Sequence, residues 1–370
     1  MTDVPHLRFP EFSGEWEMVS LQDIATINPK SDPLQNTFIY IDLEAVEKGE
    51  LRKIQEIMRE EAPSRAQRVI DNNDILFQCV RPYQKNNYIH RILNTSNQQW
   101  VASTGYAQIR TTELPNYIYH LLNTDEFNRK VMVRCTGSSY PAINSEDLAT
   151  IHLYYTPDKK EQLKISRLLD LLDKRIATQN KIIEKLQSLI KGLRVCCMQR
   201  VYGNNVYLSE IAQIYQPQTI SSTELTEDGF LVYGANGIIG KYKDYNHETE
   251  QICITCRGNT CGMVNYTKPM SWITGNAMVI NTDKYQDKVC KRYLYHYLSA
   301  YNFNSIISGS GQPQIVRTPL EKLKITLPTI SEQKQKAIIF DKIQDKIDIN
   351  HKVLNLYIGQ KQYLLRQMFI

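Results

Sequence analysis

The chain has 370 residues, of which 42% are hydrophobic and 22% charged, values that are typical of a soluble globular protein with two or three domains. It contains no run of 18 apolar residues, which excludes a membrane-spanning helix. Because the N-terminus lacks a basic and then apolar signal, we expect a cytoplasmic protein whose eight irregularly spaced cysteines are reduced thiols.

The net charge of +5 is unevenly distributed along the chain. Residues 1–157 carry a net charge of −5 and residues 158–200 one of +6, whereas residues 201–330 carry +1 and residues 331–370 carry +3. Lysine and arginine normally supply the salt-dependent part of DNA affinity by neutralising phosphates. A DNA-binding function would therefore depend on local patches or on a partner, and a solvated helix face explains the helical charges equally well.

Residues 1–157 are predicted to form a first globule of mixed α and β structure. The aliphatic segment 74–80 predicts a strand, and segment 116–133 predicts an amphipathic helix with Ile118, Leu121, Leu122 and Phe127 toward the core. The loop after the strand combines arginine, amides and tyrosines, which suit base edges in the major groove. A solvated hairpin is the alternative. The candidate DNA-binding residues of this globule are Arg81, Tyr83, Lys85, Asn86, Asn87, Ser139 and Tyr140.

Residues 158–200 are predicted to form one long helix. Asp158 follows a proline and precedes Glu161 by three residues, an arrangement that predicts a capping box at the start of the helix. Apolar residues then recur at a spacing of 3.5, which predicts a facing helix. Such a helix is about 60 Å long. The positions of this stripe are Ile165, Leu169, Leu172, Ile176, Gln179, Ile183, Leu186, Ile190, Leu193 and Cys197.

Residues 201–327 are predicted to form a second globule. The glycines of segment 232–243 follow the pattern GxxGxxG, which is wrong for a nucleotide-binding loop and favours a tight turn. A lone CxxC at Cys253 and Cys256 lies in a predicted strand and favours packing over zinc binding. Glycine-rich loops beside polar side chains suit phosphate and base contacts. The candidate DNA-binding residues here are Asn236, Lys241, Tyr242, Arg257, Asn259, Ser310, Gln312 and Gln314.

Residues 328–370 repeat the first helix at an offset of 171 residues, with Thr329 and Glu332 predicted to form the equivalent capping box. The globules share edges as well: segment 21–27 recurs as 208–214, and segment 136–143 recurs as 308–315. The second stripe comprises Phe340, Ile343, Ile347, Asn350, Leu354, Tyr357, Lys361, Leu364 and Met368. The duplication predicts an α+β protein with two globules separated by two long antiparallel coiled-coil helices related by a pseudo-twofold axis.

Gln179 and Asn350 are the amides of the two stripes and occupy the same position of the repeat. Antiparallel packing about a dyad near Lys181 would place them in adjacent central layers. A buried amide in an apolar seam costs stability but fixes the register of the helices. We therefore predict that both residues set the helix-pair register, with a solvent-exposed widening as the alternative.

Signals for catalysis are missing from the sequence. It contains no GxSxG, no HExxH and no paired CxxC, and it lacks the Asn/Asp-Pro-Pro-aromatic tetrapeptide with which an adenine methyltransferase holds a flipped base. We therefore expect no catalytic residues, no metal and no cofactor on this chain. A stand-alone DNA-binding regulator, an enzyme with an unrecognised site and a coiled-coil scaffold remain as alternatives.

The sequence resembles the specificity subunits of type I restriction–modification systems. The similarity includes segment 4–16, the Glu-Gln pair that opens each long helix, segment 234–242, Arg257-Gly258 and the Ser-Gly-x-Gly-x-Pro edge. It covers nearly the whole chain. The second helix departs from the pattern, because Gln344 stands where Asp173 does and Lys336 and Lys361 fall on stripe positions, so we expect looser ends there.

This resemblance implies two target recognition domains (1–157 and 201–327) and two conserved spacer helices (158–200 and 328–370). Each domain would read one half of a bipartite double-stranded DNA target. The helix pair would set the spacer and dock two methyltransferase subunits, and restriction subunits would join the complex. S-adenosylmethionine, ATP and Mg would then bind to those partners, and this chain would be non-catalytic and not associated with a membrane.

Overall fold

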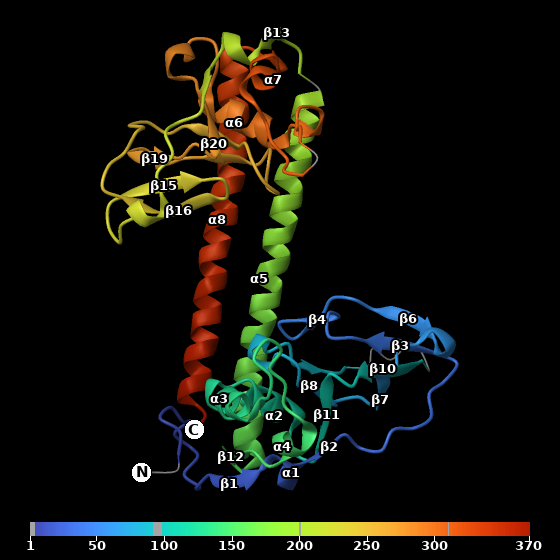
Figure 1. Ribbon diagram of the computed structural model, residues 1–370. Coiled ribbons are helices and arrows are strands. Elements are labelled where there is room, and N and C mark those ends of the chain that lie inside the picture. The colour runs from blue at the N-terminus through green and yellow to red at the C-terminus, as the bar shows by residue number, and fades with distance from the viewer. Residues whose placement is uncertain (1–3, 92–97, 200, 310) are drawn as a thin grey trace. The chain divides into compact units, whose positions relative to one another are not determined.

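The computed structural model describes residues 4–91, 98–199, 201–309 and 311–370. Two long helices dominate it, α5 (Lys159–Gln199) and α8 (Ile330–Gln367) (Figure 1). The chain divides into two compact units, each of which contains one globule and parts of both helices. Unit 1 comprises Met1–Gln179 and Val353–Ile370, and unit 2 comprises Asn180–Lys352.

Among the helices of the described ranges, none is both long enough and apolar enough to cross a membrane.

Within each unit the two long helices run antiparallel, as the sequence predicted. In unit 1, Ile165 and Leu172 of α5 share an apolar cluster with Leu364 and Met368 of α8, so the start of one helix meets the end of the other. In unit 2, residues near the end of α5 share a cluster with Phe340 near the start of α8. Every position of both predicted stripes is buried or half-buried, which confirms the heptad interpretation.

Of the three departures in the second helix, Lys336 is half-buried, whereas Lys361 and Gln344 mark a difference between the two copies of the repeat. Lys361 does not extend to water but forms an ion pair of 2.5 Å with Asp173 inside unit 1. In unit 2, Ile190 is the counterpart of Lys361 and is 4% exposed. Gln344 is the counterpart of Asp173, and its side chain donates a hydrogen bond to Asp348 of the same helix at 3.0 Å. A lysine on one helix is therefore matched by an aspartate on the other, and both are absent from the second copy.

In its described residues, unit 1 contains four sheets, two of four strands and two of two strands. A four-stranded sheet with the order β2-β11-β8-β9 packs on the long helices through a core that includes Ile75, Phe77 and Ile109, and a second sheet has the order β6-β3-β10-β7. The elements of its globule are β1 (Glu17–Ser20), α1 (Leu21–Ile24), β2 (Ala25–Ile27), β3 (Thr37–Ile41), β4 (Val46–Glu47), β5 (Glu50–Leu51), β6 (Gln55–Met58), β7 (Ala66–Ile70), β8 (Ile75–Gln78), β9 (Tyr88–Ile89), β10 (Gln99–Ser103), β11 (Tyr106–Thr111), α2 (Pro115–Leu122), α3 (Asp125–Arg134), α4 (Ser145–Ala149) and β12 (His152–Tyr155).

Unit 2 repeats this plan with a smaller second sheet. Its four-stranded sheet has the order β14-β20-β17-β18, which matches β2-β11-β8-β9 strand for strand, and β13-β21 matches β1-β12. The elements of its globule are β13 (Asn204–Tyr207), β14 (Gln213–Tyr215), β15 (Phe230–Gly234), β16 (Gly237–Tyr242), β17 (Ile252–Thr255), β18 (Val264–Tyr266), β19 (Ser271–Ile273), β20 (Ala277–Asn281), α6 (Lys291–Ala300), α7 (Arg317–Glu321) and β21 (Lys324–Leu327). The duplication seen in the sequence therefore extends to the sheet topology.

The glutamine of each Glu-Gln pair anchors a globule to its long helix. Gln162 accepts a hydrogen bond from the backbone N–H of Leu114 at 3.2 Å, and Gln333 accepts one from Cys290 at 2.8 Å. Leu114 and Cys290 are the N-cap residues of α2 and α6. Both glutamines also donate to a backbone carbonyl just before their own helix. This double role explains why the glutamine occurs in both copies.

A histidine–aspartate pair makes a second duplicated contact between globule and helix. His120 of α2 bonds to Asp170 of α5 at 2.8 Å, and His296 of α6 bonds to Asp341 of α8 at 2.7 Å. Both histidines are fully buried. Because Asp170 and Asp341 are separated by the repeat offset of 171 residues, the two globules dock on their helices in the same way.

The predicted capping box is complete at one helix and half-formed at the other. Thr329 and Glu332 exchange both hydrogen bonds at the start of α8. At the start of α5, Asp158 accepts from Lys160 N at 2.7 Å and from Glu161 N at 3.3 Å, as an N-cap does, but the carboxylate of Glu161 forms a bidentate pair with Arg8 instead of returning to the backbone. A charge-assisted bidentate pair in a buried place is stronger than a bond to a backbone N–H.

The amphipathic helix expected over residues 116–133 is two helices, α2 and α3. Thr124 accepts a hydrogen bond from Phe127 N and thereby caps α3, so a new helix begins where a continuous one was predicted. The four residues predicted to face the core are all buried. The pattern thus identified the correct face and missed the break.

Gln179 and Asn350 lie in different units, and their predicted adjacency stays a prediction. Gln179 is 8% exposed. Asn350 is half-buried and donates to the carbonyl of Lys346 at 2.6 Å. The stripe positions of both residues are therefore at least partly shielded from solvent.

Candidate nucleic-acid interface

In unit 1 the loop after strand β8 is fixed against the glycine edge of the globule. Arg81 N donates to Pro141 O at 2.7 Å, and Ile143 N donates to Cys79 O at 3.1 Å. The edge itself is closed by reciprocal bonds of 2.9 Å between Thr136 and Ala142. Two segments that are about 60 residues apart in the sequence therefore form one surface.

Unit 2 contains the same arrangement after strand β17. Gly258 N donates to Pro313 O at 3.0 Å, and Ile315 N donates to Cys256 O at 3.0 Å. Reciprocal bonds of 2.8 Å join Ser308 to Gln314. The sequence indicated both segments as candidates but gave no sign that they pair with each other.

Arg81 occupies a backbone conformation that its counterpart fills with glycine. Its φ is +55°, and the φ of Gly258 is +85°. A bulky residue with positive φ is strained and occurs mainly at functional sites. The guanidinium lies 4.3 Å from the ring centre of Tyr140, which is 64% exposed. The turn therefore presents an arginine beside an aromatic ring at the surface.

The other candidates of the first globule divide into exposed and structural residues. Tyr83 and Ser139 are exposed. Lys85 forms an ion pair of 2.7 Å with Asp125, and Asn86 accepts a hydrogen bond from Lys48 N at 3.0 Å. Asn87 is 2% exposed and bonds to Gln78 N and to Asn123. We therefore expect Lys85, Asn86 and Asn87 to position the loop, with Arg81, Tyr83 and Tyr140 available for a ligand.

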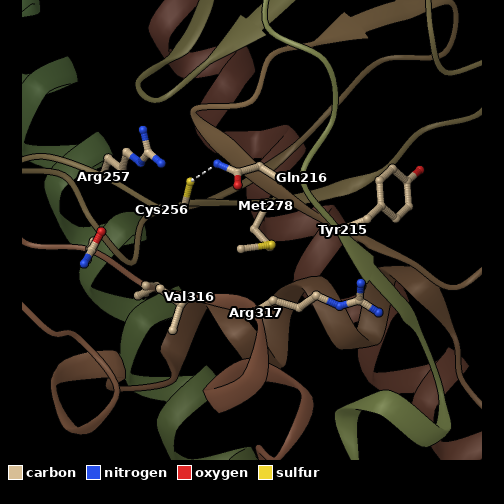
Figure 2. A pocket seen from close by; sticks show the side chains of 9 residues that line it. Tyr215, Gln216, Cys256, Arg257, Met278, Val316 and Arg317 are labelled. Atoms are coloured by element: carbon tan, nitrogen blue, oxygen red, sulfur yellow. Dashed lines mark hydrogen bonds between the residues drawn. The ribbon is translucent and has the colours of Figure 1, made fainter.

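A cavity of about 320 Å³ lies at the same junction in unit 2 (Figure 2). Met278, which is 3% exposed, and Ile315 form apolar parts of its lining. Arg257 and Gln314 line it as well, and among the described residues neither side chain has a hydrogen-bond or ion-pair partner. The cavity thus presents an apolar surface beside a guanidinium and an amide.

Two further lining residues of this cavity were missed by the sequence reasoning. Gln216, in the segment after β14, donates to the sulfur of Cys256 at 3.5 Å, and Figure 2 shows this bond. Arg317, at the start of α7, bonds to Glu321 at 2.7 Å and is on the opposite side of the view from Arg257. No sequence motif singles out either residue, because only folding brings them next to β17.

The remaining candidates of the second globule differ in their surroundings. The segment predicted as a tight turn is the hairpin β15–β16, in which Gly237 has a φ of +91°. Lys241 pairs with Asp228 at 3.2 Å, and Tyr242 contacts Trp272 edge to face. Asn236, Asn259 and Gln312 are exposed, and Ser310 lies outside the described residues.

Three cysteines of the described ranges, Cys79, Cys253 and Cys256, are buried and placed for packing. Cys253 lies in β17 and is 1% exposed, and burial raises its pKa. Burial likewise raises the pKa of the Cys79 thiol to about 12. No group of three or more metal-ligating side chains is found within the described part of the chain. Neither thiol is therefore a reactive thiolate at neutral pH.

These features define a class of protein: a duplicated chain with two similar globules, each docked on an antiparallel helix pair and each presenting one polar loop-and-edge surface. The chain belongs to the type I restriction modification DNA specificity domain family, whose model matches residues 13–188 and again residues 204–356. The double match agrees with the internal repeat.

Individual relatives agree with this assignment. The chain is 31% identical over 147 residues to the specificity subunit of the type I restriction enzyme EcoprrI of Escherichia coli. This aligned region covers 38% of this chain and 36% of that protein. The matched regions span 35–37% of the length of the three curated relatives.

Two solved structures share the fold over nearly the full length. The S subunit of a type I restriction–modification system from M. genitalium has a TM-score of 0.67 at 15% identity, with 99% of each chain covered. A chain solved in work on complex assembly and conformational transition of a type I R-M system has a TM-score of 0.59 at 20% identity, with 98% of each covered.

Proposed function

We propose that this chain is the non-catalytic specificity subunit of a type I restriction–modification complex. The observation that carries the proposal is the duplicated junction between a post-strand loop and a glycine edge, present once in each globule. Family membership and the names of the relatives support it. Each globule would read one half of a bipartite double-stranded DNA target.

The chemistry of the two junctions suits two different half-sites. Arg81 and Tyr140 characterise the first junction, and Arg257 and Gln314 the second. Arginine reads guanine through O6 and N7, and glutamine reads adenine through N6 and N7 in the major groove. Since the equivalent positions hold different side chains, we propose that the two half-sites differ in sequence.

The helix pair would set the distance between the half-sites and dock two methyltransferase subunits. Large apolar side chains on the helices remain exposed outside the internal seam, among them Leu189 at 50%, Ile349 at 57% and Leu356 at 72%. Exposed apolar groups of this kind are typical of protein interfaces. Two similar docking faces would suit two copies of one partner.

The partners would supply what this chain lacks. The first globule has a net charge of −5 and the second is close to neutral, so we expect phosphate neutralisation to come largely from the methyltransferase subunits. S-adenosylmethionine would bind to those subunits, and ATP and Mg to the restriction subunits. We expect the complex to act in the cytoplasm.

Comparison of the host's DNA methylation with and without the gene tests this function. We expect loss of one split methylation motif on deletion and its return on complementation. Affinity capture of the tagged chain should also recover a methyltransferase subunit. An unchanged methylome, or methyl transfer by the purified chain alone, would contradict the proposal.

A further inference from the structure

The short hairpin β4–β5, which no sequence pattern predicted, forms a wall beside the first junction. Its turn residues Lys48 and Gly49 both have positive φ, +50° and +82°. Val46 is 2% exposed and belongs to an apolar cluster with Tyr106. Lys48 N donates to Asn86 Oδ1 at 3.0 Å, which ties the hairpin to the loop that carries Arg81. Backbone and core contacts thus hold the wall in place.

A groove of about 830 Å³ separates this wall from the junction. Glu44 and Arg52 line it on the side of the hairpin, and Arg81 and Tyr140 line it on the side of the junction. Arg65, just before β7, also contributes to the lining. The groove is therefore continuous with the candidate surface already described.

Most polar side chains of the groove are satisfied by neighbours. Arg52 pairs with Glu47 at 3.6 Å and with Glu50 at 3.0 Å. Gln78 donates to Gln84 at 2.9 Å. These groups are held by the protein itself and are not available to a ligand without rearrangement.

Glu44 and Arg65 differ from these groups. Within the described ranges, neither side chain has a hydrogen-bond or ion-pair partner, although the two carry opposite charges and line the same groove. A carboxylate repels a phosphate, so a groove that contains both charges is poorly suited to the DNA backbone. Base edges, which offer donors and acceptors side by side, suit it better.

We propose that Glu44 and Arg65 are specificity-determining residues of the first half-site and read guanine and cytosine. Arginine donates two hydrogen bonds to guanine O6 and N7, and glutamate accepts one from cytosine N4. This inference rests on the proposed function and adds a base preference to it. It predicts at least one G·C pair in the half-site that the first globule reads.

The test replaces the chromosomal gene with Arg65→Ala or Glu44→Gln and determines the host's methylome. Discrimination at one G·C position should fall roughly 10- to 100-fold, which is the effect of losing a good base contact. Sites with other base pairs at that position should then also be methylated, while the second half of the motif stays unchanged. Arg129→Ala and Glu60→Gln are matched controls, because both residues are exposed on the same globule away from the groove lining.

Three results would overturn the inference. One is an unchanged motif with unchanged occupancy in both variants. Another is an equal loss of methylation at all sites, which would identify a phosphate contact. If alanine abolishes methylation, Arg65→Lys keeps the charge without the bidentate geometry. The Arg65→Lys variant should relax the same position of the motif. The third contradictory result would therefore be an unrelaxed motif, or a complete loss of methylation, in this lysine variant. Failure of the proposed function is distinguishable, because deletion of the gene would then leave the methylome intact.

Discussion

At the scale of single residues, buried charge explains features that the sequence alone left open. Arg8 lies in the N-terminal segment and pairs with Glu161, whose side chain is fully buried. The hydrogen bonding that Arg8 donates to this carboxylate is the main reason that the pKa of Arg8 is raised. No local pattern predicts such a pair, because its partners are 153 residues apart. Because Arg8 is so far away in the sequence, the local spacing alone led us to expect that Glu161 completes a capping box.

His90 provides a residue-scale prediction about pH. Its ring is fully buried 4.8 Å from that of Trp100, and burial lowers its pKa to about 4. The unfolded chain, with a histidine pKa of about 6.5, binds more protons between pH 6.5 and 4, so stability falls as the pH falls through this window. We expect His90 to contribute a loss of about 2–3 kcal/mol by pH 4.

Urea unfolding of the wild type and His90→Phe at pH 7 and pH 4.5 measures this contribution. The variant should lose less unfolding free energy than the wild type on acidification. An identical pH dependence of the two proteins would show that His90 is not the responsible group.

At the scale of elements, the sequence predicted helices and strands with a short-range repeating pattern, but it did not predict contacts between segments that are distant in the chain. The two long helices, strands β8 and β17 and the hairpin β15–β16 follow from periodicity and glycine placement. The split between α2 and α3 was missed because Thr124 suits a helix interior and an N-cap alike. The β4–β5 wall was missed because two-residue strands have no period to detect. The junctions were missed because each of them joins distant segments.

The paired glutamines allow a prediction with an internal control. Gln162→Leu should remove the acceptor for Leu114 N and destabilise α2, and Gln333→Leu should do the same for Cys290 N and α6. Leaving a buried donor unpaired costs about 1–3 kcal/mol. Hydrogen exchange should show faster exchange in the helix that has lost its acceptor and unchanged exchange in the other. Equal effects on both helices would contradict local anchoring.

At the scale of the whole molecule, duplication is the organising feature. The repeat keeps the helices, the four-stranded sheet and the docking contacts, and it changes the side chains at the two junctions. This pattern is what the proposed function, with one reading surface on each globule, would require. The sequence predicted the frame, whereas the bases that are read depend on side-chain positions that no motif encodes.

The helix pair gives a prediction about spacing. Half-sites read from one side of the duplex lie about 34 Å apart for each helical turn. Four residues added to both long helices lengthen each by about 6 Å. The tolerated spacer should then grow by about one or two base pairs, as determined from the methylome of the altered strain. An unchanged spacer would contradict the role of the helices as a spacer.

If each globule reads its own half-site, exchange of one globule should alter one half of the target alone. Residues 208–327 would be replaced by the matching segment of a relative with a different target, with both long helices left unchanged, and the methylome of the strain determined by sequencing. We expect one half of the split motif to change to the relative's sequence while the other half and the spacer are preserved. A change in both halves, or in neither, would contradict this expectation.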